Sequence, residues 1–179
     1  MSIRSLLKDI PPFSWCRRFL LRHGLLDRSS RSVALISFIF QRVLGCNRRV
    51  SWPVHFTSSV TVPERIKIGS GVEISFMVSG HCYYQAANGI EIGDGTIWAP
   101  GVKMISANHD PADLDRHLPA EPIRIGKGCW IGANAVILPA VQLGDRVVVG
   151  AGAVVTKSFP ADSVIVGNPA RALEKVQRQ

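Results

Sequence analysis

A large aliphatic residue recurs at every sixth position through the second half of the chain, and a small residue, usually Gly, follows most of these positions. A six-residue period matches neither the period of a helix, about 3.6 residues, nor the two-residue alternation of a half-buried strand. The pattern instead predicts a solenoid in which each repeat stacks on its neighbour. The recurring residues are Ile125, Ile131, Ile137, Leu143, Val149 and Val155.

A hexapeptide is too short for a helix, so its aliphatic residue is expected to point into a narrow core while the small residue lets the chain turn. Three such units make one triangular coil, and stacked coils bury a continuous aliphatic column. Gly, Asn and Asp suit the corners, which need tight or left-handed backbone. A β-sandwich would show two-residue alternation with turns about every 8–12 residues, which the constant register does not match. We therefore predict a parallel β-helix.

The six-residue register extends backwards through the chain and then breaks. Steps of six from Ile68 reach Met104, but the residues at the next three points are polar or Pro. The six-residue register then resumes at Ile125, three residues out of phase with the earlier steps. The break predicts an insertion at 110–122 that bulges from the solenoid, and such a bulge often lies on the binding face.

Four segments of the repeat region resemble the hexapeptide-repeat acyltransferases, and above all the maltose, galactoside and polysaccharide O-acetyltransferases. A fifth segment, Ser106–Asp110 with the insertion behind it, resembles the catalytic segment of that subgroup. The resemblance covers about residues 50–173. It implies a left-handed parallel β-helix, acetyl-CoA as co-substrate without a metal, and a homotrimer with active sites in the clefts between subunits. The four segments are Ile125–Pro139, Leu143–Asp145, Val149–Lys157 and Val166–Arg171.

His109, immediately before the insertion, is the candidate catalytic base. Acyl transfer to a hydroxyl needs a base, and an imidazole titrates close to neutral pH. One regular coil is three hexapeptides, so Glu91 is expected to stack beside His109 and orient its ring, with Asp110 or a backbone carbonyl as alternatives. The resemblance implies that the backbone N–H of Ala133 stabilises the developing oxyanion.

The resemblance also implies a groove for acetyl-CoA between subunits. Small residues there would let the thin pantetheine arm approach the backbone, and Lys157 and Arg171 could reach the phosphates of the nucleotide. Corner packing would equally explain the small residues, and a solvated surface charge would explain the lysine. The residues implied are Trp130, Ala133, Ala151, Gly152, Thr156, Lys157 and Arg171.

The acceptor side departs from the maltose-type pattern. Those relatives place an active-site Asn in the region of residues 79–85, where this chain has none, and Ser79 and His81 stand nearest to its place. Four residues could offer hydroxyl or amide contacts to a sugar, or they could cover a trimer contact: Tyr83, Tyr84, Gln85 and Asn88. The leading hypothesis is O-acetylation of a sugar or of a polysaccharide or lipid-linked glycan precursor.

The whole net charge lies before the repeats. The formal net charge is +8, and residues 1–49 hold ten Lys or Arg against two acids, so the remainder is neutral. Apolar clusters predict two helices there, at about 14–25 and 31–45, and the apolar run is too short to span a bilayer. We interpret this segment as a cap on the solenoid or as a basic amphipathic patch for an anionic membrane. No nucleic-acid recognition motif accompanies the charge.

The predicted organisation is mainly β, with a helical N-terminal segment at 1–49, the β-helix with its inserted loop at 50–170, and a tail with a short helix at 171–179. Four scattered cysteines without a CxxC motif predict neither a zinc site nor a disulfide framework. Reduced thiols in the cytoplasm are the simplest interpretation, with peripheral contact at the inner face of the membrane if the basic patch binds lipid.

Three other functions remain open at this stage. Acetylation of serine or another small molecule is an alternative within the same chemistry, although the long helical N-terminal domain of serine acetyltransferases has no counterpart. A zinc carbonic anhydrase of the same fold would need histidine ligands such as His81, His109 and His117, but their spacing does not match that family. An inactive scaffold is disfavoured by the presence of His109 and of the Val149–Lys157 segment.

Overall fold

The computed structural model describes residues 28–173 of the chain. Its first element is the helix α3 (Arg28–Phe38), which continues into the π-helical turn η1 (Ile39–Val43). The sequence predicted this helix at 31–45, so the observed helix begins three residues earlier and ends two residues earlier. The helix predicted at 14–25 lies outside the described residues.

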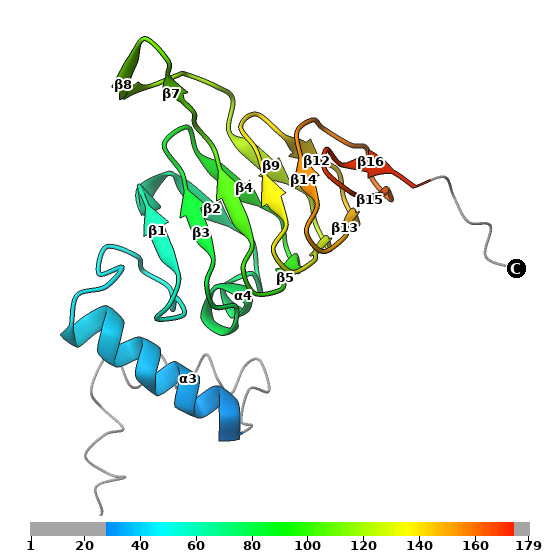
Figure 1. Ribbon diagram of the computed structural model, residues 1–179. Helices are drawn as coiled ribbons and strands as arrows, with labels where there is room; N and C mark the ends of the chain where they lie inside the picture. The colour runs from blue at the N-terminus through cyan, green and yellow to red at the C-terminus, as the bar shows by residue number, and fades with distance from the viewer. Residues whose placement is uncertain (1–27, 174–179) are drawn as a thin grey trace, which may run out of the picture.

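From Ser59 onward, short strands stack into three sheets that form the sides of a triangular prism (Figure 1). Sheet A contains β1 (Ser59–Thr61), β3 (Tyr83–Gln85), β6 (Lys103–Ile105), β11 (Val136–Ile137) and β14 (Val154–Val155). Sheet B contains β2 (Ile66–Ile68), β4 (Ile90–Ile92), β9 (Ile123–Ile125) and β12 (Gln142–Leu143). Sheet C contains β5 (Ile97–Trp98), β10 (Trp130–Ile131), β13 (Val148–Val149), β15 (Val164–Val166) and β16 (Arg171–Ala172).

The prediction of a parallel β-helix is confirmed by the pairing of these strands. Each of the regular coils visits all three sheets, so Arg124 pairs in parallel with Gln142, eighteen residues later. The recurring aliphatic residues point inward, and Ile131, Ile137 and Val155 are 0% exposed. Because each such side chain contributes roughly 1.5–3 kcal/mol relative to exposure, the stacked column is the main source of stability.

The glycine that follows most of the recurring aliphatic residues is required by the stacking of the coils. A Cβ on Gly132 would lie 2.5 Å from the backbone nitrogen of Ala151 in the next coil, closer than atoms can approach. The corners themselves use left-handed backbone at the same six-residue interval, even where the residue is not Gly. The left-handed corner residues are Gly128, Asn134, Ala140, Arg146 and Gly152.

The first coils depart from the hexapeptide rule. A short helix, α4 (Glu73–Val78), takes the place of a strand and contains Ile74, which the register placed in a hexapeptide. The side chain of Phe76 is 0% exposed, with its ring centroid 4.5 Å from Tyr84 and 4.8 Å from Trp98. The hydroxyl of Tyr84 accepts a hydrogen bond of 2.7 Å from the Trp98 indole. An aromatic cluster therefore fills the core where the aliphatic column begins.

The chain leaves the prism after β6 and returns to it at β9. Between them the strands β7 (His109–Asp110) and β8 (Asp113–His117) form an antiparallel hairpin, which stands away from the coils (Figure 1). This excursion is the insertion that the broken register predicted. At the far end of the prism, Arg171 and Ala172 form a strand where the sequence predicted a helical tail, and residues 174–179 lie outside the described range.

Candidate active site

The imidazole of His109 lies on the projecting hairpin and is exposed to solvent. Its Nδ1 is 2.5 Å from the carbonyl oxygen of Leu114. A carbonyl can only accept a hydrogen bond, so Nδ1 carries the proton of the neutral ring and Nε2 keeps its lone pair. The ring of His117, which faces His109 across the hairpin, lies 4.5 Å away between centroids. The arrangement presents Nε2 as a base.

Asp110 braces the hairpin. Its carboxylate accepts a hydrogen bond of 3.1 Å from Nε of Arg116 and one of 2.9 Å from the N–H of Ala112. The guanidinium of Arg116 lowers the pKa of Asp110, and the Ala112 N–H lowers it further. Asp110 is thus an anion that closes the turn, and the orienting partner of His109 is the Leu114 carbonyl.

We expect this brace to weaken in acid. Because the pKa of folded Asp110 lies below its usual value of 3.8, its contribution to hairpin stability is complete above that value and is lost as the pH falls through the folded pKa. Asp110→Asn should therefore speed amide hydrogen exchange in the hairpin at neutral pH, and the difference from the parent should vanish below the folded pKa. Asp115→Asn is the control, and equal exchange in the parent and Asp110→Asn at neutral pH would contradict the brace.

The base of the hairpin is held by two amide side chains from the preceding coil. Gln85, only 7% exposed, donates to the carbonyl of Ala107 at 3.2 Å and accepts from the N–H groups of Ser106 and Ala107 at 3.1 and 3.0 Å. Asn88 donates to the carbonyls of Ser106 at 3.0 Å and Leu118 at 2.9 Å. Asn88 was expected to contact a sugar or to cover a trimer contact, but both of its amide hydrogens are engaged by the hairpin base. Gln85 was also a candidate sugar contact, but its amide holds the hairpin base instead. This positioning role was not predicted, because the sequence shows only a polar residue at the end of a short strand.

Glu91 does not stack beside His109, so that prediction is wrong. The regular interval of eighteen residues does not apply there, because the chain leaves the prism between β6 and β9. Glu91 pairs instead with Lys67 and Arg124, at 2.9 and 3.3 Å between charged atoms. The hydrogen bond from Lys67 is the main reason why the pKa of Glu91 is lowered.

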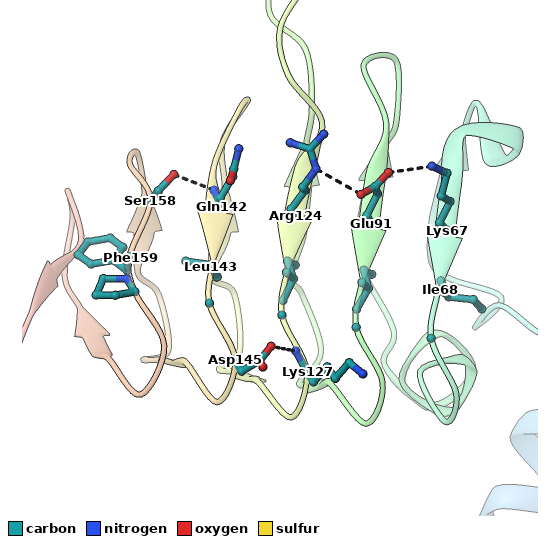
Figure 2. Close-up of a pocket in the computed structure, with 17 residues that line it drawn as sticks. Lys67, Ile68, Glu91, Arg124, Lys127, Gln142, Leu143, Asp145, Ser158 and Phe159 are labelled. Carbon is teal, nitrogen blue, oxygen red and sulfur yellow. Dashed lines mark hydrogen bonds and ion pairs between the residues drawn. The ribbon is translucent and has the colours of Figure 1, made fainter.

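This ion-pair row lies on the outer face of sheet B, where its three residues line a shallow hollow of 930 Å³ (Figure 2). Figure 2 shows Lys67, Glu91 and Arg124 in a line across neighbouring strands, with the charged atoms turned toward one another. The charges of the row therefore offset each other, and the hollow presents no concentrated charge of one sign.

The other predicted residues fall on two edges of the prism. The first edge, between sheets C and A, holds Ser79, His81, Ala133 and Ala151–Gly152, and the N–H of Gly152 donates to the carbonyl of Ala133 at 2.8 Å. The second edge, between sheets A and B, holds His109, Asn88 and Thr156–Lys157. Within one chain, sheet A separates the candidate base His109 from Ala133.

The residues near the expected acceptor differ in their availability. The hydroxyl of Ser79 is buried and donates to the carbonyl of Trp98 at 2.8 Å, so it is engaged inside the prism. His81 is exposed, and its left-handed backbone, at a φ of +57°, places it at the tip of the first edge. Tyr83 is 37% exposed on the outer face of sheet A. Of this group, His81 and Tyr83 remain free to meet a ligand.

The predicted donor residues are largely exposed. Trp130 is 55% exposed and stands between Ile97 and Val148 on the outer face of sheet C, which makes an apolar row there. Lys157 places its ammonium 5.6 Å from the ring centroid of Phe159, and Arg171 is exposed at the end of the prism. Within the described residues, the N–H of Ala133 makes no hydrogen bond.

The three histidines of the carbonic anhydrase alternative do not gather in one chain. His109 and His117 face each other on the hairpin, whereas His81 lies on the first edge. Among residues 28–173, no three His, Cys, Asp or Glu side chains are grouped to hold a metal ion.

Comparisons with known proteins match the repeat region and its surroundings. A family model described as the hexapeptide repeat of succinyl-transferase matches residues 122–157. The galactoside O-acetyltransferase of Escherichia coli K12 is 33% identical over 158 residues, which cover 86% of this chain and 73% of that protein. A Schizosaccharomyces pombe protein whose name describes it as an acetyltransferase is 35% identical over 108 residues, 58% of this chain, and the match spans about half of that protein, 52%.

One solved structure covers the chain almost completely. It is a hexapeptide-repeat acetyltransferase of Vibrio cholerae in complex with acetyl coenzyme A, which is 25% identical with a TM-score of 0.57. The alignment covers 99% of this chain and 100% of that one. The similarity therefore extends beyond the hexapeptides to the hairpin and the first coils.

Proposed function

The chain belongs to the hexapeptide-repeat acyltransferases with a left-handed β-helix, and from this premise we propose that it transfers an acetyl group from acetyl-CoA to a hydroxyl of a sugar or glycan precursor. The observation that carries the proposal is the imidazole of His109, whose Nδ1 is bound to the Leu114 carbonyl and whose Nε2 is left as a base. Similarity to a galactoside O-acetyltransferase supports a sugar hydroxyl as the acceptor.

In the proposed reaction, Nε2 of His109 removes the proton of the acceptor hydroxyl as its oxygen attacks the thioester carbonyl. The new C–O bond gives a tetrahedral oxyanion. When this intermediate collapses, the C–S bond breaks and the imidazolium returns the proton to the departing thiolate. No covalent intermediate on the protein is needed, and the products are the acetyl ester and free CoA.

The oxyanion requires a hydrogen-bond donor, and the unbonded N–H of Ala133 suits this role. Ala133 and His109 lie on different edges of one chain, so a complete site needs His109 from one copy and Ala133 from another. A ring of three copies gives each site both edges. The apolar outer row around Trp130 supports burial of sheet C between subunits, and we propose a homotrimer.

For the acetyl-CoA co-substrate, we propose a groove along the same seam. Trp130 provides a flat apolar surface, and the corner Ala151–Gly152 leaves space beside the backbone for the pantetheine arm. The cations of Lys157 and Arg171 suit the phosphates. Similarity to a protein whose structure holds acetyl coenzyme A supports this co-substrate.

Three described cysteines are free, and they support a reducing compartment for the reaction. Cys82 and Cys129 are buried, and Cys46 is exposed. Burial raises the pKa of the Cys129 thiol, which keeps it protonated and unreactive. We propose that the protein works in the cytoplasm, where such thiols stay reduced.

The proposed activity can be tested by measuring thiol release from acetyl-CoA with a panel of acceptors: galactosides, maltose, free monosaccharides, a lipid-linked glycan and serine. Release that depends on a sugar or glycan hydroxyl, with the O-acetyl product confirmed by mass spectrometry, is expected. Release with serine alone would show a different acceptor class, and hydrolysis that no acceptor accelerates would contradict the proposal.

The hairpin base gives a prediction about positioning. Gln85→Leu keeps the volume of the side chain but removes its four hydrogen bonds to Ser106 and Ala107, one of which comes from the Ser106 hydroxyl. A misplaced base costs turnover more than donor binding, so we expect kcat to fall about tenfold or more with little change in the KM for acetyl-CoA. Gln142→Leu, on the exposed face of sheet B, is the control. A rise in KM alone would contradict a positioning role.

A further inference from the structure

The helix formed by α3 and η1 has a buried face and an exposed apolar face. Ser37 and Gln41 are only 1% and 4% exposed, whereas Leu35, Ile39 and Val43 are 51%, 41% and 70% exposed. Residues spaced four apart lie on the same side of a helix, so the last three form one stripe. We define the outer face of this helix by its exposed apolar residues Leu35, Ile36, Ile39, Val43 and Leu44.

The orientation of the helix is fixed by the buried amide of Gln41. It donates to the carbonyls of Val50 at 3.0 Å and Trp52 at 2.9 Å, and it accepts from the N–H of Val54 at 3.2 Å. Turning the outer face inward would break all three bonds and leave buried polar groups unpaired, which costs about 1–3 kcal/mol for each group. The outer face is therefore held outward, on a helix that lies beside the first coils of the prism (Figure 1).

The charged residues of the helix and of the turn after it have a single sign. Residues 28–49 contain five Arg and no acidic residue. Arg42, on the helix between Ile39 and Val43, and Arg48 are exposed. The guanidinium of Arg42 also donates to the carbonyls of Arg48 at 3.3 Å and Val50 at 3.2 Å. Arg49 is also exposed but pairs with Glu64 at 2.9 Å. An apolar stripe bordered by arginines suits a binding surface that has an anionic outer layer over an apolar interior.

We propose that the outer face docks on the surface of an anionic lipid bilayer, with Leu35, Ile39 and Val43 entering the boundary of the acyl chains and Arg42 and Arg48 contacting phosphate headgroups. This is the arrangement of an interfacial helix, which lies along a membrane without crossing it. No helix in residues 28–173 is long and apolar enough to cross a membrane. A second copy of the same face is a poorer occupant, because it would bring the two sets of arginines together.

The inference goes beyond the proposed function and does not depend on it. Co-sedimentation of the full chain with vesicles of phosphatidylcholine containing phosphatidylglycerol should show binding that falls as salt is raised, with little binding to phosphatidylcholine alone. Val43→Glu, at a position 70% exposed, should weaken binding about tenfold or more. Arg42→Gln with Arg48→Gln should weaken it about 30-fold, at roughly fivefold for each arginine.

A matched control removes the same charge elsewhere: Lys67→Gln with Lys127→Gln on sheet B should leave vesicle binding nearly unchanged. Thermal melting of every variant shows whether the fold is retained, and Val43→Glu keeps the test independent of the bonds that Arg42 makes. Undiminished binding of Val43→Glu, or equal binding to neutral vesicles, would overturn the proposal. So would a smaller oligomer for Val43→Glu with unchanged vesicle binding, because the face would then join copies of the chain.

Discussion

Replacing His109 by Ala should lower kcat/KM for acetyl transfer by about 10²- to 10⁴-fold, the usual contribution of a general base. The variant loses Nε2, which takes the proton of the acceptor in the proposed reaction, and it keeps the fold because the ring is exposed on the hairpin. The KM for acetyl-CoA should change little, since the proposed donor groove lies along other residues. Initial rates of thiol release with a saturating acceptor measure the effect.

His117→Ala is the matched control for this prediction. It removes a second exposed imidazole from the same hairpin, whose ring packs 4.5 Å from that of His109. We expect a loss of only a few-fold, because the Leu114 carbonyl still orients the base. Wild-type turnover in His109→Ala would rule out the proposed mechanism, and an equal large loss in both variants would show that the hairpin needs the packed ring pair.

The repeat could be predicted from the sequence because each hexapeptide obeys the same local constraints. Ile131 must fill the column, and Gly132 must leave room for the backbone of the next coil. These constraints repeat with every coil, so the register also revealed the insertion as a break. The start of the prism was less predictable. There the helix α4 replaces a strand and is held by aromatic packing, which leaves no periodic pattern in the sequence.

The candidate site was harder to predict than the prism. The sequence predicted His109 as the candidate base because it stands directly before the insertion. Its orienting partner could not be predicted, because that partner is the backbone carbonyl of Leu114 and any residue type would provide one. The prediction for Glu91 failed because the hairpin is inserted between its strand and the next strand of sheet B. The residue paired with Glu91 is therefore Arg124, 33 residues later, and not the residue 18 positions later. Gln85 and Asn88 hold the hairpin through contacts between coils, and an interrupted register conceals such contacts.

The aromatic start of the prism leads to the largest expected loss of stability. Phe76→Ala should lower the free energy of unfolding by about 3–5 kcal/mol, because it leaves a cavity between the rings of Trp52, Tyr84 and Trp98. Urea unfolding followed by tryptophan fluorescence measures the change, at one protein concentration because an oligomer's stability depends on it. Val78→Ala, at the exposed end of the same helix, should cost about 0.5 kcal/mol or less.

The shape of the transition then tests how the coils cooperate. In a solenoid each coil contacts only its neighbours, so a weak first coil can unfold alone. Here Tyr84 joins the first coils to Trp98 through a buried hydrogen bond of 2.7 Å, and Gln85 on the same strand holds the hairpin base. We therefore expect Phe76→Ala to destabilise the hairpin as well, so that activity and tryptophan fluorescence are lost together in urea. Full activity after the fluorescence change is complete would show that the site does not depend on the aromatic cluster.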